Sequence, residues 1–292
     1  MLQAARTVHP RALLADAKSR EDPSQQIVGA EVAGDFTQTL RGQPQFFGKQ
    51  FQLPVTLRRV LLATERTEFD AGAERVAIAL ARRLGAELHV VLPIASNPEY
   101  LGAEPEVALQ AEKQAVAALA ELRQRARADG VTASVAVLPG ESLWRQIVAA
   151  AVADGADLLV TRRVGKRGLL ARLLVGEMVS QVAAHAPCPM MMVPSAASGL
   201  WQRRVLVSRS QPSAPVLSVA AALATAGGAQ LEMRDGAADL LAANAGPADL
   251  IVIELDATHV SAGRLAKDME SLIGGAACPA VLMRTAVHGA GT

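Results

Sequence analysis

Four segments of this 292-residue sequence recur in the same order, and this repeat limits the possible folds more than any single motif does. RRVLLAT at Arg58 returns as RRVLVSR at Arg203, and ARRLGAELHVV returns as ATAGGAQLEMR. GADLLVT at Gly155 returns as PADLIVI at Pro247, and APCPMMMVP returns as AACPAVLMR. Matches in a fixed order indicate an internal duplication. We therefore expect two related domains in one chain.

The second copy is predicted to be shorter than the first. Arg59 and Arg204 stand 145 positions apart, whereas Asp157 and Asp249 stand only 92 apart, so about fifty residues are missing from the second copy. The deletion falls where the first copy has a long helix and a third strand. The segment ELDATHVSAGRLAKDMESL also replaces the glycine-containing TRRVGKRGLLARLLVGEM of the first copy.

Short apolar segments alternate with amphipathic ones from Arg58 onward, without hairpin signals between them. This alternation predicts parallel strands with helices on both faces of the sheet. The fold class is α/β: tandem Rossmann-like domains, each a parallel sheet flanked by helices. One predicted helix runs from about Leu169 to His185 and leads into the last strand of the first domain.

Composition sets the expected boundaries and excludes several classes of protein. We expect an N-terminal extension that is partly extended or flexible, a full domain, a linker, a reduced domain and a tail, at residues 1–54, 55–195, 196–200, 201–287 and 288–292. A net charge of +1 predicts no nucleic-acid partner, and no apolar run reaches the length of a membrane span, so membrane insertion is not expected. Only two cysteines, Cys188 and Cys278, are present, which fits a cytoplasmic protein with buried thiols.

The segment TRRVGKRGLLARLLVGEM, residues 161–178, has some features of a phosphate-binding loop and lacks another. Glycines allow the backbone to approach a phosphate, and basic side chains surround them. Yet Glu177 stands where a small hydroxyl would serve a phosphate better.

Residues 57–194 resemble the universal stress protein family, and residues 201–286 do so more weakly. The resemblance implies a five-stranded parallel sheet in the full domain and pairing of two domains through their last strands. Nucleotide-binding members of that family resemble the pattern G-x2-G-x9-G-[ST] after the fourth strand, with an acidic residue at the end of the first strand.

This chain departs from that pattern. Arg162 replaces the first glycine, one residue is inserted before the last glycine, and Glu177 replaces the Ser or Thr. A carboxylate beside a triphosphate is repulsive by roughly a few kcal/mol. The degenerate pocket is predicted from Glu65, Arg162, Gly165, Lys166, Arg167, Gly168, Gly176 and Glu177.

The last strand of the first domain, in CPMMMVP, is predicted to form the interface between the domains. Methionine side chains adapt to a partner surface, and the resemblance implies pairing there. The predicted interface residues are Met190, Met191, Met192 and Val193.

Two functions remain open on the sequence. The first is a non-enzymatic regulatory or adaptor protein that acts by protein–protein contact, without a cofactor and without a metal, and associates with itself through the last strands as an intramolecular pseudo-dimer or a homodimer. The second is an ATP- or AMP-binding stress-response switch, with or without Mg²⁺. No catalytic residue is predicted, because the five histidines are scattered and no nucleophile motif is present.

Overall fold

The computed structural model describes residues 56–95, 105–163, 176–209, 211–236, 239–240 and 245–284. The predicted N-terminal extension and the C-terminal tail lie outside these residues, so the expectations for them stay predictions. Within the described residues, no helix combines the length and apolar character needed to cross a bilayer.

The first half of the molecule alternates strands and helices as the sequence predicts. Its strands are β1 (Arg59–Ala63), β2 (Glu87–Ala95), β3 (Ala133–Gly140), β4 (Leu158–Arg162) and β5 (Met190–Val193). Its helices are η2 (Glu68–Asp70), α2 (Ala71–Leu84), α4 (Pro105–Ala128), α5 (Leu143–Ala153) and α6 (Glu177–His185).

The second half repeats this arrangement in shortened form. Its elements are β6 (Arg204–Val207), α7 (Ala214–Gly227), β7 (Gln230–Met233), β8 (Asp249–Leu255), η4 (Ala257–His259), β9 (Val260–Ser261), β10 (Arg264–Leu265), α9 (Lys267–Gly275) and β11 (Ala280–Arg284). Among its described residues, no strand corresponds to β3 and no helix to α4. The short hairpin β9–β10 occupies the place of the glycine-containing loop.

The predicted helix from Leu169 to His185 is wrong in its extent. Gly176 has φ −62° and ψ 146°, which is extended backbone, and helix α6 begins only at Glu177. A residue in this conformation precedes a helix rather than continuing one, because its dihedral angles cannot form the next helical turn. Residues 164–175 lie outside the described part of the chain.

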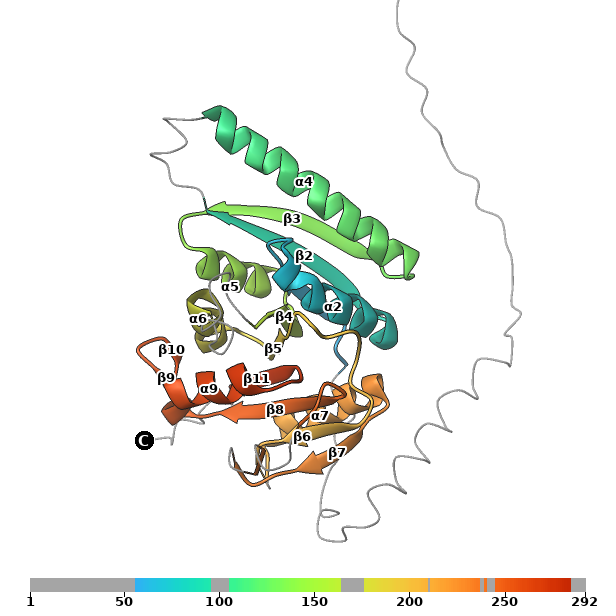
Figure 1. Ribbon diagram of the computed structural model, residues 1–292, viewed down its shortest axis with the longest axis vertical. Coiled ribbons are helices and arrows are strands. Elements are labelled where there is room, and N and C mark those ends of the chain that lie inside the picture. Colours follow the sequence, from blue (N-terminus) through green and yellow to red (C-terminus); the bar gives the residue numbers. More distant parts are fainter. Residues whose placement is uncertain are drawn as a thin grey trace, which may run out of the picture. The chain divides into compact units, whose positions relative to one another are not determined.

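All main strands join one nine-stranded sheet in the order β3-β2-β1-β4-β5-β11-β8-β6-β7 (Figure 1). Neighbouring strands are parallel within each half, and this confirms the predicted fold class. The exception is the pair β5 and β11, which is antiparallel. The last strands of the two halves therefore lie side by side and continue one sheet into the other.

The strand pairing shows that the two halves are built on the same register. Val60 of β1 lies opposite Leu158 of β4, and the equivalent residues Val205 and Leu250 lie opposite each other in β6 and β8. The offsets between the copies are the 145 and 92 positions read from the sequence. Residues of the two halves can therefore be compared position by position on these strands.

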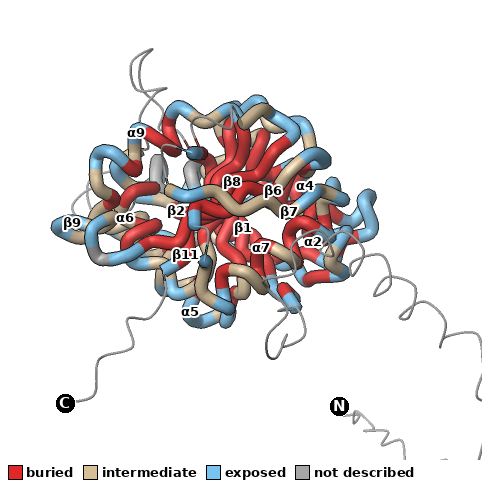
Figure 2. Tube along the Cα trace, turned by 90° about the horizontal axis from the view of Figure 1, so that it is seen from below, coloured by how far each residue is buried: buried red, intermediate tan, exposed pale blue. Residues whose placement is uncertain are grey.

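Helices cover both faces of the sheet, and the strands between them are buried (Figure 2). Apolar side chains of α2, α4 and α7 pack on one face, and those of α5, α6 and α9 pack on the other. Burial of these two layers supplies most of the free energy that favours the folded state.

Trp201 attaches the chain between the halves to helix α7. Its side chain is fully buried, and its indole N–H donates to the carbonyl of Leu223 at 2.9 Å. Gly227 permits this approach, since a Cβ atom at that position would lie 2.3 Å from the Trp201 carbonyl oxygen.

Candidate functional site

A crevice of the first half lies at the carboxyl ends of β1 and β4. The chain leaves β1 toward β2 on one side and places β4 on the other, so this is a point where the direction of winding reverses. Ligands of open α/β sheets bind at such points. The crevice is lined by Ala63, Thr64, Glu65, Asp70, Pro93, Ile147, Thr161, Arg162 and Met178.

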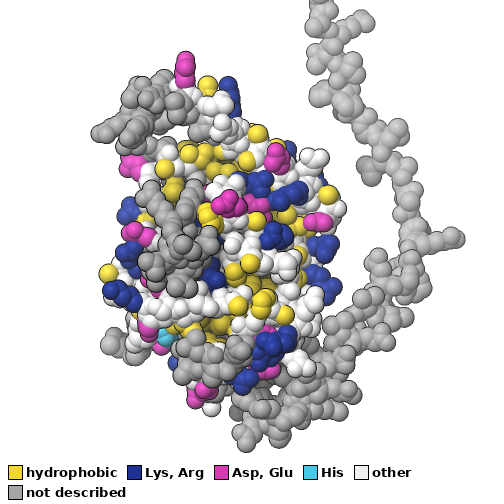
Figure 3. All heavy atoms as spheres, in the orientation of Figure 1, with side chains coloured by type: hydrophobic (Ala, Val, Ile, Leu, Met, Phe, Trp, Pro, Cys, Tyr) yellow, Lys and Arg dark blue, Asp and Glu magenta, His cyan; other side chains and the backbone are white. Residues whose placement is uncertain are grey.

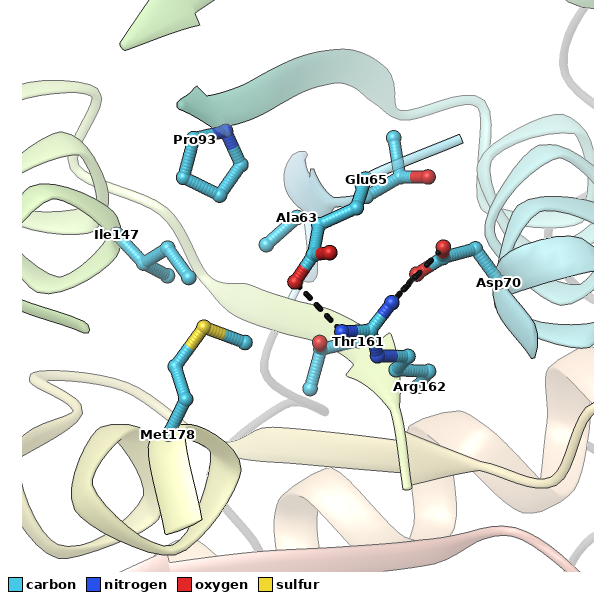
Figure 4. A pocket seen from close by; sticks show the side chains of 9 residues that line it. Ala63, Glu65, Asp70, Pro93, Ile147, Thr161, Arg162 and Met178 are labelled. Atoms are coloured by element: carbon cyan, nitrogen blue, oxygen red, sulfur yellow. Dashed lines mark hydrogen bonds and ion pairs between the residues drawn. The ribbon is translucent and has the colours of Figure 1, made fainter. Parts of the chain in front are cut away.

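Arg162 fills this crevice (Figure 4). Its side chain is only 5% exposed, and its guanidinium lies between two carboxylates, with Nη2 at 2.5 Å from Glu65 Oε1 and Nη1 at 3.1 Å from Asp70 Oδ2. The space left between the lining residues that would admit a water molecule is about 0 Å³. Two predicted site residues, Glu65 and Arg162, are thus brought together, and they neutralise each other.

Asp70 belongs to this arrangement and was not among the predicted site residues. It ends the single-turn helix η2, where its carboxylate accepts hydrogen bonds from the Thr67 backbone N–H at 2.9 Å and the Thr67 hydroxyl at 2.6 Å. The sequence signal was available, since Thr67-Glu-Phe-Asp70 has the spacing of a capping box. These hydrogen bonds hold the Asp70 carboxylate in the position where it pairs with Arg162.

A second buried carboxylate supports the turn after β1. Glu74 of α2 accepts a hydrogen bond from the Thr64 hydroxyl at 2.9 Å and pairs with Arg66 at 2.6 Å. Arg125 of α4 also contacts it. Arg66 has a positive φ of 57°, and its ion pair and its backbone hydrogen bond to Thr64 Oγ1 hold the turn in this conformation. The position of Glu65 at the mouth of the crevice is fixed by this network.

Glu177 is not among the residues that line the crevice. Its side chain is 71% exposed and pairs with Arg264 of β10 at 2.7 Å. The expectation that its carboxylate would oppose a bound triphosphate stays a prediction. Gly176 caps the same helix, whereas Gly165, Lys166, Arg167 and Gly168 lie outside the described residues.

The equivalent crevice of the second half is open. It lies at the carboxyl ends of β6 and β8 and has a volume of about 180 Å³. Its lining residues are Ser208, Arg209, Asp235, Gly236, Leu240, Ile253, Glu254, His259, Met269 and Leu272. The sequence alone predicts no site residues in this half.

The predicted interface residues Met190–Val193 form β5 and are fully or almost fully buried. Met190, Met191 and Met192 lie opposite Leu282, Val281 and Ala280 of β11. Buried Arg163 contacts the carbonyl of Ala276 and lies 3.5 Å from that of Cys278. Burial lowers the pKa of this guanidinium.

The two thiols show no sign of reactivity. Burial raises the pKa of both Cys188 and Cys278 to about 12, so little thiolate forms near neutral pH. The described residues contain no group of three or more His, Cys, Asp or Glu side chains placed to hold a metal ion.

Comparison with known proteins gives the same assignment over the first half. The model of the universal stress protein family matches residues 56–194. A universal stress protein of Thermus aquaticus is 34% identical over 139 residues, which are 47% of this chain and 98% of that protein. A universal stress protein of Methanocaldococcus jannaschii is 26% identical over 141 residues, covering 47% of this chain and 81% of the relative.

Solved structures resemble the fold across both halves. A universal stress protein of Archaeoglobus fulgidus superposes with a TM-score of 0.59 at 15% identity, over 81% of this chain and 99% of that one. A functionally unknown protein of Pseudomonas aeruginosa gives a TM-score of 0.57 at 15% identity, over 78% and 92% of the two chains. The 34% identity to the Thermus aquaticus protein over 98% of its length shows that the chain belongs to the universal stress protein family.

Proposed function

We propose that this universal stress protein is a non-enzymatic adaptor or regulator that acts through protein–protein contacts and binds no nucleotide in its first half. The observation that carries the proposal is the position of Arg162, which closes the crevice by pairing with Glu65 and Asp70. The nucleotide-binding pattern that the sequence resembles has a glycine at this position, and a glycine would leave the space open.

Opening this crevice would be costly. A nucleotide would have to displace Arg162 and so break its ion pairs with Asp70, 1% exposed, and Glu65, 16% exposed. Removing one partner of a buried ion pair costs about 3–5 kcal/mol of stability, because the other charge stays buried without compensation. The phosphates would then lie beside two carboxylates, which adds repulsion. These two costs would offset much of the free energy gained from nucleotide contacts, so the net affinity for a nucleotide would be weak.

The surface offers support for a protein partner. Leu109 and Val116 of α4 are 52% and 55% exposed, and their spacing of seven residues places them on the same side of the helix. On the face shown in Figure 3, basic and acidic side chains are interspersed among apolar ones. Such a mixed surface suits a protein partner better than a polyanion.

Self-association is proposed to be satisfied within the chain. The edge of β5, through which the resemblance implies domain pairing, is occupied by β11 of the same chain. A homodimer that used this edge would have to separate the two halves. We therefore propose an intramolecular pseudo-dimer, with the protein partner bound elsewhere.

Nucleotide content and affinity test the proposal. Full-length protein is purified gently and denatured, and the supernatant is chromatographed for nucleotide; refolded or dialysed protein is then titrated with ATP and AMP, with and without Mg²⁺. The proposal predicts no stoichiometric nucleotide and no binding up to about 1 mM, which corresponds to a free energy weaker than about −4 kcal/mol. Binding in the micromolar range would overturn it.

The second candidate, an ATP- or AMP-responsive switch, is favoured by the position of Glu177. Since this carboxylate pairs with Arg264 outside the crevice, it would not repel a phosphate there. The switch requires Arg162 to leave the crevice on binding. Micromolar binding of ATP or AMP without release of phosphate would support the switch. Sustained release of phosphate would support an enzyme instead.

A further inference from the structure

The two crevices carry opposite charges at equivalent positions. Arg162 ends β4, and the residue 92 positions later, at the same place in β8, is Glu254. Its counter-ion is reversed as well: Arg209 follows β6, one position before the equivalent of Glu65, and its Nη1 lies 3.5 Å from Glu254 Oε1. The repeat has thus exchanged a buried cation, Arg162, for a buried anion, Glu254, at the same position of the strand.

This exchange also changes the free space. In the first half the long arginine side chain reaches across the crevice and leaves about 0 Å³. In the second half the shorter glutamate comes from the sheet, and Arg209 is 50% exposed at the surface, so about 180 Å³ remains open. A single water needs roughly 10–15 Å³ on such a scale, so the cavity holds more than isolated waters.

The cavity joins a buried carboxylate to an apolar wall. The Glu254 side chain is 3% exposed, and its Oε2 accepts a hydrogen bond from the Ser213 backbone N–H at 3.2 Å. The wall is formed by four apolar side chains, which are Leu240, Ile253, Met269 and Leu272. A polar group at one end and an apolar body along the other side are the features such a cavity can recognise.

The charges around the cavity select the sign of a ligand. Glu254 and Asp235 are acidic and Arg209 is basic. These three side chains together carry one net negative charge. A phosphate would be repelled by the buried carboxylate, whereas an ammonium group would balance the site.

The geometry points to a binding site in the second half for a small organic ammonium ion with an apolar body, whose nitrogen donates to Glu254 and whose body packs on Met269 and Leu272. At about 180 Å³ the cavity is smaller than those that hold drug-sized ligands, roughly 300–1,000 Å³, so the ligand is a small amine. The site does not depend on the closed first crevice, so it stands or falls separately from the adaptor proposal.

The test uses the full chain and a pair of matched probes. 2-Phenylethylammonium carries the charge and an aromatic body that suits a methionine wall, and 2-phenylethanol has the same body without the charge. Titration calorimetry and ligand-observed NMR are expected to give a Kd below about 1 mM for the amine and at least about tenfold weaker binding for the alcohol, since about 1.4 kcal/mol separates a factor of ten. AMP is not expected to compete.

Three variants assign the binding to this cavity. Glu254→Gln keeps the shape and removes the charge, so amine binding falls at least about tenfold. Arg209→Gln removes the competing cation, so amine binding strengthens by several-fold. Glu177→Gln, on an exposed carboxylate paired with Arg264, leaves binding unchanged and is the control.

Thermal melting is measured for each variant beforehand. If Glu254→Gln does not fold, the strengthening in Arg209→Gln decides the matter, because a merely structural role for this pair predicts no gain in affinity. The inference is overturned if the amine and the alcohol bind equally, if the amine does not bind, or if folded Glu254→Gln binds like the unchanged protein.

Discussion

Ser180 and Glu270 meet across the two halves of the molecule at equivalent positions of the repeat, 90 residues apart. Ser180 Oγ donates to Glu270 Oε1 at 2.6 Å and accepts from the Leu265 backbone N–H at 3.0 Å. Met191 and Val281 have the same spacing and lie opposite each other in β5 and β11. The axis that relates the two halves therefore passes through this contact, and the contact between the halves is nearly symmetric there.

Replacing Ser180 with Ala is expected to lower the free energy of unfolding by about 1–3 kcal/mol. The side chain is fully buried, and its loss leaves the N–H of Leu265, a residue only 4% exposed, without its acceptor. Urea unfolding measures the change. Ser271→Ala is the control, because that exposed hydroxyl only bonds the Lys267 carbonyl of its own helix; equal effects of the two changes would contradict the assignment.

Met191→Asp is expected to destabilise the protein by more than about 4 kcal/mol. Met191 is fully buried at the β5–β11 contact, and an unpaired carboxylate there cannot be solvated. Met191→Leu keeps the volume and should cost less than about 1.5 kcal/mol. Melting curves and light scattering report the outcome, and an unchanged melting temperature for the Asp variant would refute the assignment of this contact.

Arg162→Met is expected to lower stability by about 3–5 kcal/mol, since Glu65 and Asp70 lose the cation between them. Arg264→Met removes a guanidinium that is 42% exposed and pairs with an exposed glutamate, so it should cost about 0–1 kcal/mol. Chemical denaturation compares the two. Similar losses of stability in both variants would show that buried Arg162 stabilises the fold no more than exposed Arg264 does.

Asp249→Asn is expected to reduce stability by about 3 kcal/mol at pH 7 and by a smaller amount at pH 3, where the loss of the charge effect has only begun. Burial by itself would raise the pKa of this carboxyl, but hydrogen bonds from Arg203, Arg204 and the Gly246 N–H together hold it well below its usual range. A group with a depressed folded pKa stabilises the fold above its unfolded pKa, about 3.9, and loses this effect as the pH falls.

Urea unfolding at pH 7, 5 and 3 measures the difference between the unchanged protein and Asp249→Asn. The difference should be constant from pH 7 to pH 5 and shrink at pH 3. Asp129→Asn, at an exposed position after α4, should remain within about 0.5 kcal/mol at each pH. A difference that does not depend on pH would refute the role given to the Asp249 charge.

The fold could be predicted because its signals are local and repeated. Alternating segments such as Arg59–Ala63 and Ala71–Leu84 carry their own periodicity and stop signals, and Gly85 ends α2 with φ +63°. The start of α6 could not be placed, because apolar residues before Gly176 continue a helical pattern that the extended glycine interrupts. The low helix propensity of Gly176 does not by itself distinguish a break from a glycine tolerated within a helix.

The candidate site was predictable only in part, because its decisive contacts join distant segments. The sequence showed Arg162 at a position where glycine would leave space, and it showed Glu65 at the end of the first strand. It did not show that Glu177 would pair with Arg264, 87 residues later, since nothing local selects that partner. The reversal from Arg162 to Glu254 was readable from the repeat offset, but its meaning required the two cavity volumes.

The joining of β5 to β11 inside one chain has a consequence for how such a protein can diverge. In a homodimer every substitution appears in both subunits, so the two crevices must change together. Once both halves are encoded separately on a single polypeptide, a substitution can close one crevice and leave its counterpart free to vary. The covalent link also makes the contact between the halves independent of protein concentration. The second half could therefore lose a strand and a long helix and still remain associated with the first half.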